Sequence, residues 1–235
     1  FVVWTLLARF FYRSSVRQDE TGDVGLTLRM QRFSAPAMLL YAITITFAAF
    51  DLLMSLDPHW YSTIFGVYYF SGGVVGFFAL LSLVTYLVQR SGKLTHVITA
   101  AHYQDLGKLV FAFVVFWAYI AFSQYILIWY ANLPEETGHY AARLSGGWSM
   151  LFYLNPILNW VVPFVVLLSA GAKRHAPTLV PVAIVVLLGR WLDGYLLVAP
   201  AAGPLRGFPT AAVAATVAVL GGMGLVFSRI LAREA

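Results

Sequence analysis

The chain contains no cysteine among its 235 residues. It therefore cannot hold a thiolate-bound iron–sulfur cluster, a thioether-attached haem or a disulfide. The long apolar runs also lack histidine in their interiors, because the five histidines lie in polar segments or at run ends, at positions 59, 96, 102, 139 and 175. A transmembrane haem needs axial histidines buried on facing helices. The sequence thus predicts no haem, and we expect His96, His139 and His175 at the surface.

Charged residues are scarce as well. Only 11% of the residues are charged and 60% are hydrophobic, with a mean hydropathy of +0.79. A soluble domain of this length could not cover so much apolar surface, so the sequence predicts an all-α, polytopic transmembrane helix bundle. The net charge of +5 comes from basic residues that separate apolar runs instead of forming one patch. Lipid headgroups and membrane topology explain this pattern better than nucleic-acid binding does.

The chain also lacks a starting methionine and a signal-peptide n-region, since Phe1 lies inside an apolar run. We expect residues 1–235 to be a single integral-membrane domain, a fragment that lacks its N-terminal spans. Six complete spans and one truncated N-terminal span are predicted, at residues 1–12 (truncated), 35–56, 63–89, 102–131, 148–170, 178–199 and 210–232. Residues 13–34 are expected to form an Arg-rich cytoplasmic loop, with Ser34 as helix cap and Pro36 in the next first turn.

Basic residues divide unequally between the two sides of this predicted bundle. One side carries Arg9, Arg13, Arg17, Arg29, Arg32, Arg90, Lys93, Lys173, Arg174, Arg229 and Arg233, whereas the other carries Arg143 and Arg206. Such asymmetry follows the positive-inside rule. We therefore place residues 13–33, 90–102, 171–177 and the C-terminus in the cytoplasm. The connections 57–62, 133–147 and 199–209 then face outward.

The predicted span that begins at His102 carries polar residues along one strip. At about 100° per residue, Asp105, Lys108, Tyr119, Ser123 and Tyr130 fall within roughly 60° of one another. A lipid-facing helix does not need such a strip, which favours a hydrogen-bonded proton path. His102 would be its entry group, because imidazole titrates near neutral pH. The alternative is that Asp105 and Lys108 form a simple interfacial ion pair.

Other ionisable residues also lie inside predicted spans. Arg190 and Asp193 are three residues apart on one helical face, so they can neutralise each other. They would either fix helix packing or form a charge station on a proton path. Asp51 lies about one turn inside its span, where it would reach the surface or form the exit of that path.

Glycine, proline and asparagine mark points where helices meet or break. Gly72, Gly73 and Gly76 indicate close helix packing. Prolines inside the later spans are expected to kink or start helices. Asn155 and Asn159 flank such a position at Pro156, and they leave open a binding site at a broken helix.

Three stretches carry a resemblance to a known family: SLDPHWYSTIFGVYYFSGG (55–73), HYQDLGKLVFAF (102–113) and FWAYIAFSQYILIWYANLPEET (116–137). They closely resemble the F subunit of alternative complex III, a bacterial quinol:cytochrome c (or high-potential acceptor) oxidoreductase. That subunit belongs to the NrfD-like superfamily of polysulfide-reductase-type membrane subunits. The resemblance covers most of residues 32–159 and is mainly hydropathic beyond residue 173.

The resemblance implies a multi-pass subunit of the bacterial inner membrane without redox centres of its own. Its partners would be a quinol-oxidising NrfD-like paralogue, multihaem cytochrome and iron–sulfur subunits, and lipid. The implied role is to conduct or pump protons coupled to quinol oxidation, with His102, Asp105 and Lys108 in the motif and Asp51 before it. A second histidine is common in the family where this chain has Gln104, which cannot titrate, so that position cannot carry protons here.

Two alternatives to proton conduction remain open. In the first, the chain is a quinone-binding anchor of polysulfide-reductase type that holds a quinone or menaquinone near Asp51, Asp57 and His59. In the second, it is a structural scaffold. The sequence shows no catalytic triad, metal-ligand spacing or phosphate-binding loop, so we do not expect it to catalyse a reaction alone.

Overall fold

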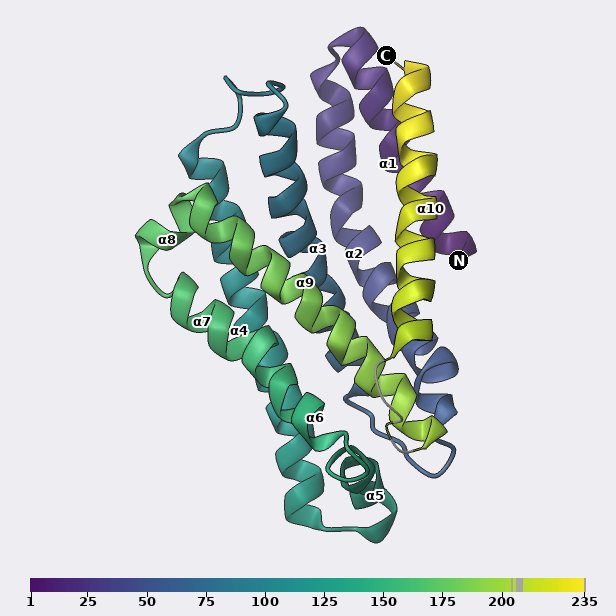
Figure 1. Cartoon of the computed structure of the whole chain (residues 1–235). Helices are drawn as coiled ribbons and strands as arrows, with labels where there is room; N and C mark the ends of the chain where they lie inside the picture. The colour runs from purple at the N-terminus through teal and green to yellow at the C-terminus, as the bar shows by residue number, and fades with distance from the viewer. Residues whose placement is uncertain (204, 206–208, 235) are drawn as a thin grey trace.

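The computed structural model of the chain describes residues 1–203, 205 and 209–234, and every element within them is a helix (Figure 1). The α-helices are α1 Val2–Thr21, α2 Val24–Leu52, α3 Phe65–Arg90, α4 Ala100–Ala131, α5 Pro134–Arg143, α6 Ser149–Pro156, α7 Val162–Leu167, α8 Ala170–Arg174, α9 Ala176–Val198 and α10 Thr210–Glu234. Short 3-10 turns follow α2 (Met54–Leu56) and α9 (Ala199–Ala202). The prediction of an all-α fold is confirmed for this part of the chain.

Within the described residues, five helical segments are long and apolar enough to cross a membrane: Val24–Leu56, Phe65–Arg90, Ala100–Ala131, Ser149–Leu167 and Ala176–Ala202. These segments indicate a multi-pass membrane protein. The apolar part of α10, Thr210–Leu225, is shorter. The count of six complete spans and one truncated span therefore stays a prediction.

The expected loop at residues 13–34 is instead a helical hairpin. α1 continues to Thr21, Gly22 takes a left-handed conformation (φ 65°), and α2 starts at Val24. The Asp23 side chain caps α2 by accepting a hydrogen bond from Gly25 N–H, which is the usual role of Asp at this position. The prediction of a loop, with Ser34 and Pro36 starting the next helix, was wrong because a polar, Arg-rich segment can remain helical beyond an apolar one.

The predicted span at residues 148–170 is broken in its middle. α6 passes into a π-helical turn, Ile157–Val161, before α7 begins. Pro156 and Pro163 flank this turn, and neither has a backbone N–H to donate to the helical ladder, so the ladder widens locally. The break turns Asn159 into the bundle, where its side chain is 1% exposed.

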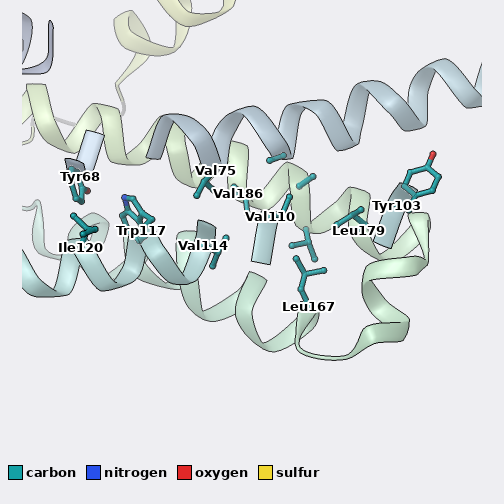
Figure 2. Close-up of a cluster of buried hydrophobic side chains, with 13 residues drawn as sticks. Tyr68, Val75, Tyr103, Val110, Val114, Trp117, Ile120, Leu167, Leu179 and Val186 are labelled. Carbon is teal, nitrogen blue, oxygen red and sulfur yellow. The ribbon is translucent and has the colours of Figure 1, made fainter. Parts of the chain in front are cut away.

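The apolar core lies where α3, α4 and α9 pack together, with α7 closing one side (Figure 2). Its fully buried members include Val75, Val110, Val114, Leu167 and Val186. Gly107 on α4 lets the short helix α8 approach closely, because a Cβ atom there would lie 3.1 Å from the Lys173 main chain.

The connections gather at two ends of the bundle (Figure 1). The α1–α2 turn, the α3–α4 connection and the C-terminal end of α10 lie at one end, here called the basic end. The loop after α2 and the helix α5 lie at the opposite end. This arrangement places the basic connections as the charge pattern predicts, except that Arg206 lies outside the described residues. Which end faces the cytoplasm stays a prediction.

Candidate functional site

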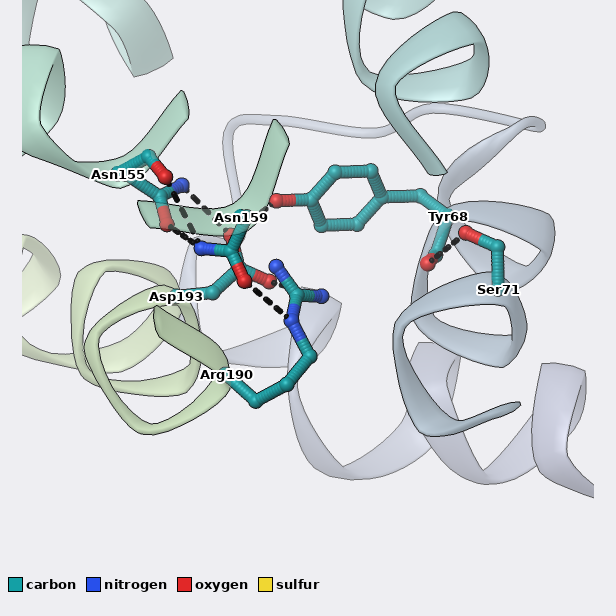
Figure 3. A network of polar contacts seen from close by, with 6 residues as sticks. All are labelled: Tyr68, Ser71, Asn155, Asn159, Arg190 and Asp193. Carbon is teal, nitrogen blue, oxygen red and sulfur yellow. Dashed lines mark hydrogen bonds and ion pairs between the residues drawn. The ribbon is translucent and has the colours of Figure 1, made fainter. Parts of the chain in front are cut away.

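A buried ion pair on α9 organises the polar interior. Arg190 Nη1 lies 3.3 Å from Asp193 Oδ2, and the two side chains are 12% and 8% exposed (Figure 3). The predicted pairing of these residues is therefore confirmed. An unpaired charge at this depth would carry a large desolvation cost, so the partners around the pair decide whether it is stable.

Two asparagines on the broken helix form hydrogen bonds with the two members of this ion pair. Asn155 donates to Asp193 Oδ1 at 2.8 Å, and Asn159 Oδ1 accepts from Arg190 Nε at 2.7 Å. Asn159 also donates to Asn155 Oδ1 at 2.6 Å, which joins the two amides. The π-helical turn and Pro156 thus place both amides toward α9, as the alternative of a site at a broken helix expected.

α3 supplies the third wall of this network. The Tyr68 hydroxyl donates to Asp193 Oδ1, so this carboxylate oxygen accepts from both Tyr68 and Asn155 (Figure 3). Gly72 leaves room for the Arg190 side chain, because a Cβ there would lie 2.4 Å from Arg190 Nη1. The predicted close packing is confirmed at Gly72, whereas a Cβ at Gly73 or Gly76 would make an ordinary contact at 3.6 Å.

A cavity of about 660 Å³ opens beside this network, between α4, α5, α6 and α9. Its mouth is lined by exposed aromatic residues, Tyr119, Phe122 and Tyr153. Its inner wall carries Tyr68 and Asp193. A volume of this size, with apolar walls and a few convergent polar groups, is typical of small-molecule sites.

Buried polar atoms without partners lie along the same cavity. Among the described residues, Trp117 Nε1 and Gln124 Oε1 are buried without a hydrogen-bond partner, although both residues line the cavity. Arg190 does not line the cavity, but its buried Nη2 is likewise unpaired, and its guanidinium carbon lies 4.3 Å from the Trp117 ring centroid. Unsatisfied donors and acceptors of this kind are uncommon in protein interiors. They fit a ligand that brings hydrogen-bonding groups of its own.

α5 closes the cavity at the end away from the basic end. Arg143 is 5% exposed and donates to the carbonyls of Leu196 (3.0 Å), Leu197 (3.2 Å) and His139 (2.8 Å). Two of these carbonyls belong to the last turn of α9, where a cation is favourable. Burial lowers the pKa of Arg143 to about 10, so it remains a cation at neutral pH and fastens α5 to α9.

His139 lies one helical turn before this arginine on α5. Its ring stacks on Trp60 with centroids 3.7 Å apart and is 6% exposed, so the prediction of a surface histidine was wrong. Burial, and then the charge of Arg143, lower the pKa of His139 to about 2. The 3.5 Å approach of His139 Nδ1 to Asp57 Oδ2 is therefore a contact of a neutral ring, since the desolvation of this site outweighs one partly exposed carboxylate.

A tyrosine and a glutamine connect α5 to the cavity wall. Burial raises the pKa of Tyr140 to about 12, so its hydroxyl keeps its proton. Gln124 Nε2 donates to that oxygen at 3.2 Å. Tyr140 and Gln124 are thus neutral groups of the cavity lining, whereas Asp193 and Arg143 are charged ones.

The predicted proton path along α4 lies on the outer face of this chain. Asp105 and Lys108 pair at 3.1 Å with side chains 70% and 58% exposed, while Tyr119 and Tyr130 are 65% and 83% exposed. Ser123 is half-buried. The face of α4 that packs on α3 and α9 is the other one. Of these five residues, Tyr119 reaches the cavity.

Two motif residues of α4 have structural contacts at the basic end. His102 Nδ1 accepts the Thr99 N–H at 3.1 Å and forms a capping box with Thr99. Gln104 accepts from Arg174 Nε at 2.7 Å, which ties α8 to α4. Gln104 therefore has a structural contact at this end of the bundle.

The residues predicted to hold a quinone do not meet at the cavity. Asp51 and His59 are exposed, and Asp57 is half-buried against His139. None of the three lines the cavity. Sequence reasoning missed Tyr68, Gln124 and Arg143, whose partners lie far away along the chain.

Comparison with known proteins assigns the chain to no family. No protein-family model matches the chain, and no curated protein matches it significantly. In the part of the chain that the structure describes, no group of three His, Asp or Glu side chains could hold a metal ion.

Proposed function

We propose that this chain is a quinone-binding membrane subunit of a quinol:electron-acceptor oxidoreductase of the alternative complex III type. The observation that carries the proposal is the cavity of about 660 Å³ whose apolar walls end at Tyr68 and Asp193. A quinone combines an apolar ring and tail with two oxygens that accept or donate hydrogen bonds. The resemblance of the three motifs to that family supports the same assignment.

The residues of the cavity suit the protonation states of such a ligand. The Asp193 carboxylate accepts a proton or hydrogen bond from a quinol hydroxyl, and Arg190 stabilises its charge when the proton leaves. The Tyr68 hydroxyl donates to Asp193, so its oxygen remains free to accept a hydrogen bond from a quinol hydroxyl. The exposed aromatic mouth admits the apolar tail from the lipid side. Electrons would pass to redox centres in partner subunits.

The test is to fill the cavity without touching its polar groups. Ala121→Trp places a large ring in the cavity wall, whereas Ala112→Trp places the same ring on the exposed face of α4 outside it. We expect Ala121→Trp to weaken binding of a short-chain quinone analogue by at least roughly tenfold, because steric overlap removes its contacts. Binding is measured by titration of the purified membrane protein.

Equal affinities for the two tryptophan variants would contradict the assignment of the cavity. Retention of native quinone, measured by extraction from each purified variant, provides a second readout that does not depend on the analogue.

Proton conduction is the second candidate function, and the buried Arg190–Asp193 pair favours it. Ionisable residues inside membrane spans often mark proton relays. The described core between this pair and the basic end is mainly apolar: Val75, Val110 and Val186 are fully buried, and the hydroxyl of the buried Ser82 donates to the Phe78 carbonyl of its own helix. A complete path would therefore run along the outer strip of α4 and require a partner subunit to enclose it.

This second candidate makes its own prediction. Asp105→Asn and Asp193→Asn should lower the number of protons moved per electron in liposomes that contain the whole complex, while assembly is retained. An unchanged number of protons per electron in both variants would contradict proton conduction by this chain. If quinone binding were also unaffected by Ala121→Trp, a scaffold role would remain.

A further inference from the structure

A second cavity, of about 400 Å³, lies between α1 and α2 and is lined by arginine. Arg9, Arg13 and Arg17 come from α1, and Arg29 comes from α2. The three arginines of α1 are four residues apart, so they lie along one helical face with a rise of about 6 Å between neighbours. Leu6 and Leu26 line the same cavity.

No acidic residue lines this cavity among the residues whose side chains the structure describes. Among the residues that the structure describes, none of the four guanidinium groups forms an ion pair with a carboxylate. Four like charges around one cavity repel each other, and an anion between them relieves that repulsion.

The hairpin that carries these arginines is braced along its length. Near its turn, the Gln18 side chain donates to Thr27 Oγ1. Further into the bundle, Trp4 Nε1 donates to Thr44 Oγ1 at 2.8 Å. Between these clamps, the Arg29 guanidinium carbon lies 5.6 Å from the Phe10 ring centroid. A cation held in this way is preorganised, so less conformational entropy is lost when an anion binds.

The lining changes character along α1. Leu6 lies on the side of the apolar span, and Arg13 and Arg17 lie toward the α1–α2 turn. This order matches a phospholipid, whose acyl chains lie in the bilayer and whose phosphate lies at its surface. The guanidinium group forms paired hydrogen bonds with phosphate oxygens, and basic pockets at the ends of membrane helices bind anionic headgroups.

We propose that the α1–α2 hairpin binds the phosphate group of an anionic phospholipid, with Arg13 and Arg17 as its principal ligands and Arg9 and Arg29 at its sides. The site is separate from the cavity beside Asp193 and does not depend on the quinone proposal. Its effect is to hold α1 against α2 at the membrane surface.

The test compares two double variants that remove the same charge. Arg13→Gln with Arg17→Gln empties the centre of the cavity. Arg32→Gln with Arg90→Gln removes two exposed arginines of the basic end that do not line it. We expect the first pair to weaken binding to vesicles of phosphatidylglycerol in phosphatidylcholine by roughly tenfold or more, and the second by about twofold or less.

Binding is measured with the delipidated full chain, both by vesicle titration and by the rise in its thermal unfolding midpoint. Equal losses for the two double variants would show a general surface charge effect and overturn the proposal. Inorganic phosphate is titrated in parallel. Protection by phosphate equal to that by phosphatidylglycerol would overturn the lipid assignment, whereas protection by the lipid alone supports it.

Discussion

At the scale of single residues, His139 is held in its neutral form by its surroundings. Its ring is stacked on Trp60, and the Arg143 guanidinium donates to the His139 carbonyl. Both burial and that positive charge disfavour the imidazolium ion. The folded protein therefore cannot take up a proton here over the range in which an ordinary histidine does.

We predict that the protein loses stability as pH falls below about 6.5. The unfolded chain binds a proton at His139 near that pH, whereas the folded chain, with a pKa of about 2, does not. The free energy of unfolding should fall by about 1.4 kcal/mol per pH unit once the pH is well below 6.5. Above pH 6.5 this residue contributes no pH dependence.

Thermal unfolding midpoints in detergent from pH 8 to pH 5 check this expectation. The slope should flatten in His139→Gln and stay unchanged in His96→Gln, which alters an exposed histidine. A slope that His139→Gln leaves unaltered would assign the acid sensitivity to other groups.

At the level of single residues, the sequence predicted contacts between side chains that are close along one helix. Arg190 and Asp193 are neighbours on one helix, so their pairing follows from an i, i+3 spacing. The partners that stabilise the pair could not be predicted from local spacing, because Tyr68 lies 125 residues from Asp193 and Asn155 lies 38 residues from it. His139 was misjudged for the same reason, since a polar segment of sequence gives no sign that Trp60 covers it.

At the scale of helices, α9 meets the broken helix at a glycine. A Cβ atom at Gly189 would lie 2.7 Å from Asn159 Oδ1, whereas nothing lies within 4 Å of the equivalent position at Gly194. The two glycines share one helix and differ mainly in their surroundings. A comparison of alanine substitutions at the two positions therefore separates the effect of close packing from the intrinsic cost of glycine in a helix.

We predict opposite effects for alanine at these two positions. Gly189→Ala should destabilise the protein by about 1–3 kcal/mol, because it displaces the Asn159 amide from Arg190. Gly194→Ala should stabilise it by up to about 1 kcal/mol, because alanine is the better helix former. Unfolding in mixed micelles gives both values, and a stabilised Gly189→Ala would contradict the close contact.

Helix positions could largely be predicted from apolar runs, but helix ends and buried faces could not. Hydropathy located the runs that became α3, α4 and α9. It could not distinguish the helical hairpin at residues 13–34 from a loop, because polar composition alone does not determine backbone conformation. On α4 the polar strip was correctly grouped, yet Gly107 and its apolar neighbours form the packed face.

At the scale of the whole molecule, the basic end is predicted to face the cytoplasm. The absence of native cysteine makes this testable with single substitutions. Ser91→Cys lies at the basic end after α3, and Glu136→Cys lies on α5 at the opposite end; Ser91 is exposed and Glu136 is partly exposed. The Glu136 carboxylate forms no ion pair with another described residue.

We expect a membrane-impermeant maleimide to label Glu136→Cys in intact spheroplasts and Ser91→Cys after permeabilisation. The reverse pattern would invert the topology, and labelling of both in intact cells would contradict the placement of the two ends. The cysteine-free parent protein is the control for background labelling.

The tight helix contacts also predict how related sequences diverge. The obstacle beside Gly107 is the main chain of Lys173, which no substitution can shorten, so position 107 should remain glycine in any relative that keeps α8 docked. The obstacle beside Gly189 is a side chain. Positions 189 and 159 are therefore free to change together, and a relative with a larger residue at 189 should carry a smaller one at 159.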